Sequence, residues 1–440
     1  MPLGQRFLRS PWTWASLAIA IGCTFSIVHL IQDVMKDRKA EDDSRIPGLN
    51  ADALWMCAGL ALPTMIFWIV CFILIDRYKP QRLLVWAIAL IWGGTFAVNA
   101  SYVLNSWASD QMAVIDQTSG VSAIRVAVFV APFIEEATKA SVIFLIVVLD
   151  RNRFTSRVSG AIVGGLAGAG FAFVENIIYY ARVVVYGSYT GSAGDVKQAL
   201  DYLVYMRGVV TCFGHPLFTM MTGVGVAFAV TSRSKIVRVI SPAAGFLMAA
   251  FLHMFFNFQA SMIPAEQLKL YAFFMAWPVV IGVIIRVISS SIRQGRTVSA
   301  RLTEYVSVGW LPNNYPAAFS KLRTRAWTVI MSIWHGSPIK TWLLQKRATD
   351  LAMLSEEISR GTVDEGGLWR EFELVNEIRD LEEKRGLVDG KGLRPYWPWN
   401  ARKRKGISGF PPPSEFLPGG ATMGAPLKYS AVDPRWKPPV

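Results

Sequence analysis

The sequence predicts an all-α, polytopic membrane protein with about eight transmembrane helices, a cytoplasmic helical hairpin and a disordered tail. Of its 440 residues, 52% are hydrophobic and only 17% are charged, and its mean hydropathy is +0.34. That composition is too apolar for an ordinary soluble protein. Eight apolar stretches reach the roughly 20 residues that a spanning helix needs, and basic residues gather in alternate connecting segments.

The eight predicted spans follow one another from near the N-terminus to about residue 290. They cover approximately residues 11–32, 51–75, 83–105, 122–149, 158–184, 206–230, 239–262 and 270–290.

The connecting segments alternate in charge. Basic residues cluster before the first span, at 76–82, at 150–157, at 231–238 and after the eighth span, whereas the loops 106–121 and 263–269 hold one Lys between them. By the positive-inside rule, both termini lie in the cytoplasm. The positive-inside rule and the attraction of basic residues to anionic lipid therefore account for the net charge of +14. No nucleic-acid partner is expected.

Changes in composition and apolar periodicity along the chain predict three domains. Residues 1–291 form the transmembrane domain, with a catalytic core at 120–262. Residues 292–393 form a cytoplasmic helical extension, in which apolar periodicity predicts two helices at 338–360 and 366–386. Residues 394–440 are rich in Pro and Gly, contain a basic run and lack apolar periodicity, so we expect a disordered tail.

Four consecutive spans carry ionisable or amide side chains. A charge at the bilayer centre costs at least about 2.5 kcal/mol, so such groups normally face a bundle interior or a watery cavity. Glu135, Glu175, His215 and His253 lie 14 or 15 residues from positions near the cytoplasmic ends of their spans, which puts them about 21–22 Å deep. The positions from which we count are Leu149, Ala161, Val230 and Val239, respectively. Because these motifs lie on four spans at the same depth in the membrane, they predict one buried polar site. Its residues are Glu135, Glu136, Lys139, Glu175, Asn176, His215, His253 and Asn257.

Helical spacing predicts which of these groups share a face. Glu135 and Lys139 are one turn apart with the acid first, which favours an ion pair and leaves Glu136 about 100° round the helix for other work. Taken alone, the pair is equally well read as self-neutralising, and His253 with Asn257 as an interhelical hydrogen bond. The fifth span carries a ridge of small residues suited to close helix approach, and Glu175 continues its face. The ridge consists of Gly160, Gly164 and Gly168.

These residue types suit two kinds of peptide hydrolysis. In the first, a carboxylate in a poorly solvated pocket takes and returns a proton, while histidines and an amide orient water and stabilise the oxyanion. In the second, two His and one Glu bind zinc, and another Glu acts as the base. The sequence contains no HEXXH or other short zinc motif, so spacing does not decide between the two.

Four motifs in order resemble the signature set of PrsW-type intramembrane proteases. They are EEATK (Glu135–Lys139), FAFVEN (Phe171–Asn176), the segment from Arg207 to HPLFT at His215, and HMFFN (His253–Asn257). The family is similar to the wider superfamily of CAAX-prenyl proteases and bacteriocin-processing enzymes. The resemblance covers roughly residues 120–262. Glu175 stands where the CAAX-type branch has His, so histidine-based roles cannot be copied onto it.

The resemblance implies a glutamate-dependent or metal-dependent endopeptidase of the bacterial cytoplasmic membrane that cleaves membrane-tethered proteins. Anti-sigma factors are substrates associated with the family. The implied catalytic residues are Glu135 or Glu136 as the base that activates water, His215 and His253 for water, oxyanion or metal, and Asn257 as an assistant. Glu175 is also a candidate catalytic residue, without a role copied from the histidine. The implied supporting residues are Lys139, Asn176 and Arg207. The implied cofactor is zinc or another divalent metal, with Glu136, Glu175, His215 and His253 as candidate ligands.

Two other functions fit parts of the sequence. A proton- or ion-coupled transporter also uses buried Glu and His, but it predicts an inverted repeat, whereas the polar motifs lie only in spans four to seven. A sensor or scaffold would act through the cytoplasmic hairpin, with the membrane polar groups as packing contacts. The function that we expect is intramembrane proteolysis.

Overall fold

The chain is almost entirely helical over the residues that the computed structural model describes. These are 11–39, 45–76, 78, 81–115, 124–150, 157–190, 195–263, 266–334, 336–359 and 365–385. Within them, a short antiparallel pair joins β1 (Arg38–Lys39) to β2 (Arg45–Ile46). The predicted all-α, polytopic class is confirmed. The predicted tail, 394–440, lies outside the described residues.

Two compact units make up the chain. One consists of Met1–Asp76 with Gln81–Ile285, and the other of Arg77–Pro80 with Arg286–Val440. The division falls inside a long helix, a few residues before the boundary expected at 291–292. The roles assigned to the predicted domains stay predictions.

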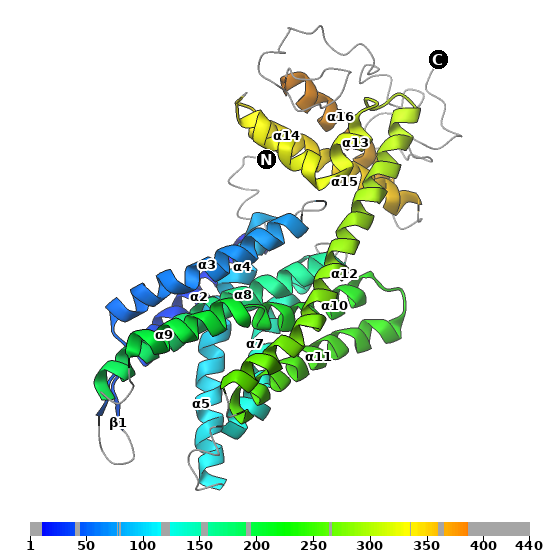
Figure 1. Cartoon of the computed structure of the whole chain (residues 1–440). Coiled ribbons are helices and arrows are strands. Elements are labelled where there is room, and N and C mark those ends of the chain that lie inside the picture. Colours follow the sequence, from blue (N-terminus) through cyan, green and yellow to red (C-terminus); the bar gives the residue numbers. More distant parts are fainter. Residues whose placement is uncertain are drawn as a thin grey trace. The chain divides into compact units, whose positions relative to one another are not determined.

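The first unit is a bundle of long helices (Figure 1). Its helical segments in chain order are α2 (Pro11–Val34), α3 (Ala51–Ile75), α4 (Leu83–Trp92), η1 (Gly93–Ala97), α5 (Val98–Ile115), η2 (Val126–Val130), α7 (Ala131–Asp150), α8 (Arg157–Thr190), α9 (Val196–Tyr205), η4 (Met206–Val210), α10 (Gly214–Thr231), α11 (Lys235–Met262) and the first part of α12 (Glu266–Ser307). The η segments are single π-helical turns that continue the α-helices beside them.

Within the described residues, six helical stretches are long and apolar enough to cross a membrane. They run Trp12–Val34, Ala51–Ile75, Leu83–Met112, Arg157–Ser188, Val196–Thr231 and Lys235–Ser261. The predicted fourth span coincides with η2 and α7, and the predicted eighth lies inside α12. Both are helical over the required length, although neither is among the six stretches. The total of eight spans stays a prediction.

Helix α8 lies at the centre of the first unit because its small residues let three neighbours approach closely. A Cβ at Gly160 would meet the Gly223 carbonyl oxygen of α10 at 2.1 Å, and one at Gly164 would meet the Thr219 oxygen at 2.4 Å. At Gly168 the contact is the His215 oxygen, at 2.3 Å. The predicted ridge is therefore a backbone-to-backbone interface, and its partner is the helix that carries His215.

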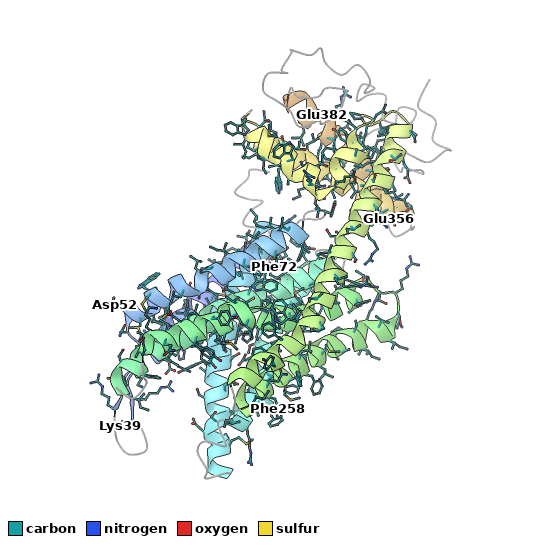
Figure 2. The ribbon with its side chains drawn as sticks, in the orientation of Figure 1. Lys39, Asp52, Phe72, Phe258, Glu356 and Glu382 are labelled. Carbon is teal, nitrogen blue, oxygen red and sulfur yellow. The ribbon has the colours of Figure 1, made fainter. Side chains whose placement is uncertain are left out.

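Two further glycines of α8 also let neighbouring helices approach closely. A Cβ at Gly170 would meet the Leu90 oxygen of α4 at 2.0 Å. A Cβ at Gly165 would meet the ring of Phe72, at 2.3 Å, and Phe72 is a fully buried residue of α3 (Figure 2). These contacts fix the height of α8 against its neighbours, since no side chain can adjust at a glycine.

The structure extends the helices beyond the predicted fifth and sixth spans, 158–184 and 206–230. Between those spans, α8 continues to Thr190 and α9 covers Val196–Tyr205. The Asp195 side chain caps α9 by accepting from the Lys197 backbone N–H at 2.9 Å, and the Lys197 ammonium pairs with Asp201 one turn later. Capping and an exposed ion pair stabilise a helix whose polar composition had suggested a connection.

The second unit is a smaller helical domain. After the end of α12 it contains α13 (Tyr315–Ser320), α14 (Leu322–Ile333), α15 (Pro338–Ser359) and α16 (Glu365–Arg385). Helices α15 and α16 lie within two residues of the predicted helices and pack against each other, as a hairpin requires. The sequence analysis assigned no helix to α13 or α14.

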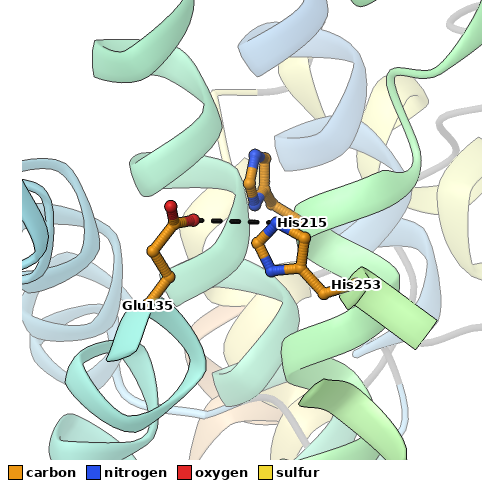
Figure 3. Close-up of side chains that lie close together, drawn as sticks. All are labelled: Glu135, His215 and His253. Atoms are coloured by element: carbon orange, nitrogen blue, oxygen red, sulfur yellow. Dashed lines mark ion pairs between the residues drawn. The ribbon is translucent and has the colours of Figure 1, made fainter. Parts of the chain in front are cut away.

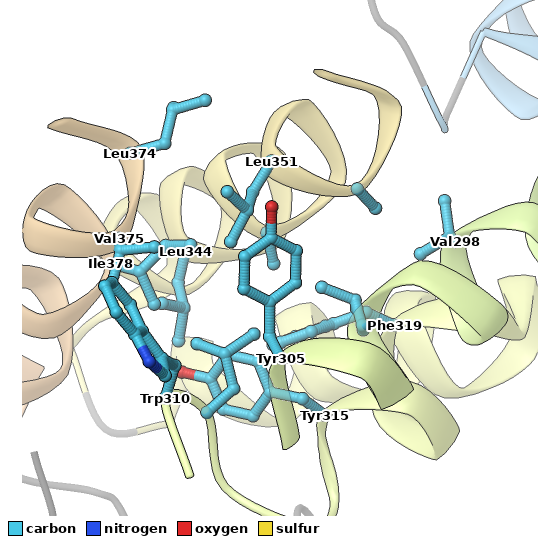
Figure 4. Packing of buried hydrophobic residues seen from close by; sticks show 14 of the residues in the cluster. Val298, Tyr305, Trp310, Tyr315, Phe319, Leu344, Leu351, Leu374, Val375 and Ile378 are labelled. Atoms are coloured by element: carbon cyan, nitrogen blue, oxygen red, sulfur yellow. The ribbon is translucent and has the colours of Figure 1, made fainter. Parts of the chain in front are cut away.

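The core of the second unit is aromatic and aliphatic, and it contains paired polar groups (Figure 4). Leu344 and Leu351 of α15 meet Ile378 of α16 in this core. The Tyr305 hydroxyl donates to the buried Glu371 carboxylate, and burial raises the pKa of Tyr305 well above its usual value. This buried acid is therefore satisfied within the unit.

The α8–α10 interface gives a direct test of the fold. Gly164→Ala should lower the free energy of unfolding by roughly 1–3 kcal/mol, because the new methyl group overlaps the backbone of α10. The matched control is Gly22→Ala in α2, where an added Cβ meets nothing within 4 Å. Thermal unfolding in detergent measures both. Equal stability of the two variants would contradict the close approach.

Candidate active site

Four helices bring most of the predicted site residues together at one level. Helix α7 contributes Glu135, Glu136 and Lys139, while α8, α10 and α11 contribute Glu175, His215 and His253. Their side chains are linked by hydrogen bonds and ion pairs that cross between helices. Figure 3 shows Glu135, His215 and His253 converging from three helices. The expectation that these spans share one polar cluster therefore agrees with the geometry.

Glu136 is the most firmly held acid in the cluster. Its side chain is fully buried, and its Oε1 lies 2.7 Å from the equally buried Lys139 ammonium. Its Oε2 accepts from the Thr219 hydroxyl at 2.8 Å, and Oε1 also lies 3.2 Å from His253 Nδ1. Three partners leave this carboxylate little capacity for another ligand.

Helix α7 contains the expected ion pair and a closer one. The Lys139 ammonium is 3.7 Å from Glu135, as predicted, and 2.7 Å from Glu136. Glu136, which was expected to be free of Lys139, is therefore engaged by it. Thr219 and His253, which lie on other helices, also contact Glu136 and hold it beside Lys139.

Glu135 makes fewer hydrogen bonds than Glu136. Its Oε1 accepts a long hydrogen bond from Asn105 of α5, at 3.3 Å. Its Oε2 is buried and has no hydrogen-bond partner within the described part of the chain. That oxygen lies 3.7 Å from His253 Nε2 (Figure 3). A buried carboxylate oxygen without a partner marks a position where a water, a proton or an ion completes the structure.

The partners of the two histidines determine which ring nitrogen carries hydrogen. Because the Glu136 carboxylate only accepts, His253 Nδ1 donates to it, and Nε2 presents a lone pair toward Glu135. Because the Lys139 ammonium only donates, His215 Nδ1 accepts from it at 3.0 Å, and Nε2 donates to Glu175 at 2.8 Å. Both His215 nitrogens are thus engaged, whereas His253 Nε2 faces an acceptor.

Glu175 and its neighbours form the second half of the site. Arg207 donates to Glu175, and its Nε donates to Asn176 at 2.7 Å. The guanidinium also lies over the ring of Tyr179, at 4.2 Å. Arg207 and Asn176 therefore hold Glu175 against His215, which is the supporting position that the sequence analysis gave them.

A small cavity adjoins this half of the site. Its volume is about 30 Å³, which accommodates at least one water molecule. Helices α3, α8, α10 and α11 contribute to its wall. The lining includes Thr64, Asn176, Arg207, His215, Phe218 and Phe256.

Asn257 is the predicted site residue that the structure leaves outside the cluster. Its amide donates to the Ala127 carbonyl oxygen of η2 at 2.8 Å. No hydrogen bond recorded for it within the described residues reaches another predicted site residue. Asn257 instead ties α11 to the helix turn before α7, which is the interhelical role that the sequence analysis weighed for it.

Two contributors were not assigned a role from the sequence. Asn105 lies on α5, outside the predicted core at 120–262, and contacts Glu135. Thr219 contacts Glu136; it ends the HPLFT motif, but no role was predicted for it. Asn105 could have been predicted as a site residue, because it is an amide inside an apolar span, like the residues of the other motifs.

The donor set fits a divalent metal. Glu135, His215 and His253 each offer a ligand atom, and these atoms lie within 4.8 Å of one another. One carboxylate and two imidazoles are common zinc ligands, and the unpartnered Glu135 Oε2 points into the group. Ligation by His215 requires one of its nitrogens to release Lys139 or Glu175. The predicted ligand set named Glu136 and Glu175, which are already paired; the geometry favours Glu135.

One comparison with known proteins gave a match. Neither the curated proteins nor the solved structures matched this chain. Residues 79–283 match the model of the PrsW family of intramembrane metalloproteases, and this range includes all the predicted site residues. Over that range, slightly less than half of its length, the chain is similar to the PrsW family, and the match indicates a hydrolase of the intramembrane protease class.

Proposed function

We propose that the chain hydrolyses peptide bonds of membrane-anchored protein substrates at the cluster around Glu135. The observation that carries the proposal is the buried Glu135 Oε2, which lacks a hydrogen-bond partner within the described residues and faces His253 Nε2 at 3.7 Å. Two acceptors that face each other in a buried site need a proton, a water or a cation between them. Each of these is a participant in peptide hydrolysis.

Glu135 is the group that we assign to water activation or metal ligation. Glu136 accepts from Lys139, Thr219 and His253, so it serves to orient His253 and to balance the Lys139 charge. Glu175 orients His215 in the same way. Carboxylates that accept from the far nitrogen of a histidine are common around catalytic imidazoles.

Zinc is the metal that we propose. A zinc ion held by Glu135, His215 and His253 would polarise the scissile carbonyl and lower the pKa of its bound water. Glu136 and Glu175 then remain as the acids that position the two imidazoles. The small cavity beside Arg207 and His215 supplies space for water.

The substrate and the setting are further parts of the proposal. We propose the bacterial cytoplasmic membrane as the location, with both termini in the cytoplasm, because basic segments alternate along the sequence. An anti-sigma factor anchored by a single span is the first substrate to test. The family match does not favour the proton-coupled transporter considered above.

Glu135→Gln should abolish cleavage. General base catalysis contributes about 10²- to 10⁴-fold, and the amide can neither take a proton nor bind metal as a carboxylate does. Cleavage of a coexpressed, tagged single-span protein that the unmodified chain cuts measures this. Asp201→Asn on α9, where the acid is exposed and pairs with Lys197, is the matched control. An active Glu135→Gln enzyme would refute the assignment.

Metal content separates the two kinds of hydrolysis. Purified chain should contain about one divalent ion per molecule, as a mononuclear site requires, and His253→Ala should lose it. Asn257→Ala should keep it, because Asn257 contacts the Ala127 backbone instead. Elemental analysis measures the ion without any activity assay. Active protein without metal would establish the glutamate mechanism instead.

A further inference from the structure

Helix α14 in the second unit packs with its polar side inward. Arg325 is only 5% exposed, and its guanidinium donates to the Thr349 hydroxyl of α15 at 2.6 Å and to the Phe319 carbonyl oxygen at 3.1 Å. Gln345 of α15 donates to the Arg325 backbone oxygen at 3.0 Å. Ser332, two turns along the same face, is also buried. The contact between α14 and α15 is thus largely polar.

The opposite side of α14 is apolar and exposed. Trp334 is 77% exposed, and Ile339 at the start of α15 is 72% exposed. The exposed large side chains of this surface, which we call the tryptophan face, are Trp327, Ile330, Ile333, Trp334, Ile339 and Trp342. A helix in water buries its apolar side and exposes its polar side. The reversed arrangement indicates that something other than water covers this face.

The sequence that forms the tryptophan face is basic. From Tyr305 to Thr349 it contains six Lys or Arg residues and no Asp or Glu; of these six, Arg325 is buried and Arg347 pairs with Glu377 of α16. Lys321 and Arg323 are exposed beside the start of α14, and the Lys346 ammonium lies 5.5 Å from the ring centroid of Trp342. A partner that matches this surface is apolar inside and negatively charged at its rim.

A lipid surface has both properties, an apolar interior and negatively charged headgroups. Tryptophan favours the boundary between headgroups and hydrocarbon, and helices that lie in this boundary combine Trp and aliphatic residues on one side with Lys and Arg beside them. Anionic headgroups attract basic residues by about 1 kcal/mol each. The same chain crosses the membrane, so its connection to the spans keeps this surface at a high effective concentration near lipid.

We propose that the tryptophan face docks the second unit onto an anionic lipid surface, with Trp327, Ile330 and Trp334 inserted at the headgroup level. Residues 321–342 then form a monotopic membrane contact in addition to the spans. The docking does not depend on peptidase activity. It makes this part of the chain a membrane-bound domain.

Spin labels placed on the full chain test the depth of this surface. The labelled position is Ile330→Cys, and a second label at Ile339→Cys guards against a local effect of either substitution. Glu373→Cys on α16, which is exposed and polar, is the matched control. Cys71 and Cys212 are the two partly buried thiols, so they are first replaced by Ala. The protein is reconstituted in vesicles of phosphatidylcholine, with or without phosphatidylglycerol.

Accessibility to oxygen and to a water-soluble nickel complex gives the result. We expect the oxygen-to-nickel ratio at positions 330 and 339 to exceed that at 373 by about tenfold, which corresponds to about 1.4 kcal/mol of differential partitioning, and to rise with phosphatidylglycerol. Labels that nickel reaches freely would overturn the proposal, since the face would be in water. Labels that neither probe reaches would also overturn it, since protein would cover the face. An equal ratio in both vesicle types would overturn the role of the basic residues.

Discussion

The close approach of α8 and α10 is the constraint on which the candidate site depends. Backbone meets backbone at Gly160, Gly164 and Gly168, so the two helices have one relative height and little freedom to slide. The last of these contacts is with His215 itself, and two helical turns beyond Gly168 the same helix presents Glu175. The hydrogen bond between Glu175 and His215 is therefore a consequence of glycine packing. A site in which acids and imidazoles must meet within hydrogen-bond distance requires this kind of rigid support.

The buried ion pair between Glu136 and Lys139 organises the part of the site that lies on α7. Neither group is exposed, and breaking such a pair by removing one partner typically costs about 3–5 kcal/mol. The pair fixes the tautomers of both histidines, since Glu136 accepts from one ring and Lys139 donates to the other. These two residues therefore shape the site without offering a vacant lone pair to a ligand.

Much of this arrangement was predictable from sequence, and the reasons for the failures are physical. The spans, the glycine ridge and the level of the polar motifs follow from apolar length and helical rise, which depend only on local sequence. The pairing of Lys139 with Glu136 depends on Thr219 and His253, which belong to other helices. The contribution of Asn105 depends on how α5 packs against α7.

The count of formal charges in the cluster has a consequence for any reaction there. Three carboxylates, Glu135, Glu136 and Glu175, face two permanent cations, Lys139 and Arg207. With both imidazoles neutral, the empty cluster holds one surplus negative charge away from bulk water. A proton brings the sum to zero, whereas a dication leaves one positive charge, equal in size to that of a single oxyanion. The protein scaffold is thus short of one positive charge, which a proton supplies and a dication exceeds by one.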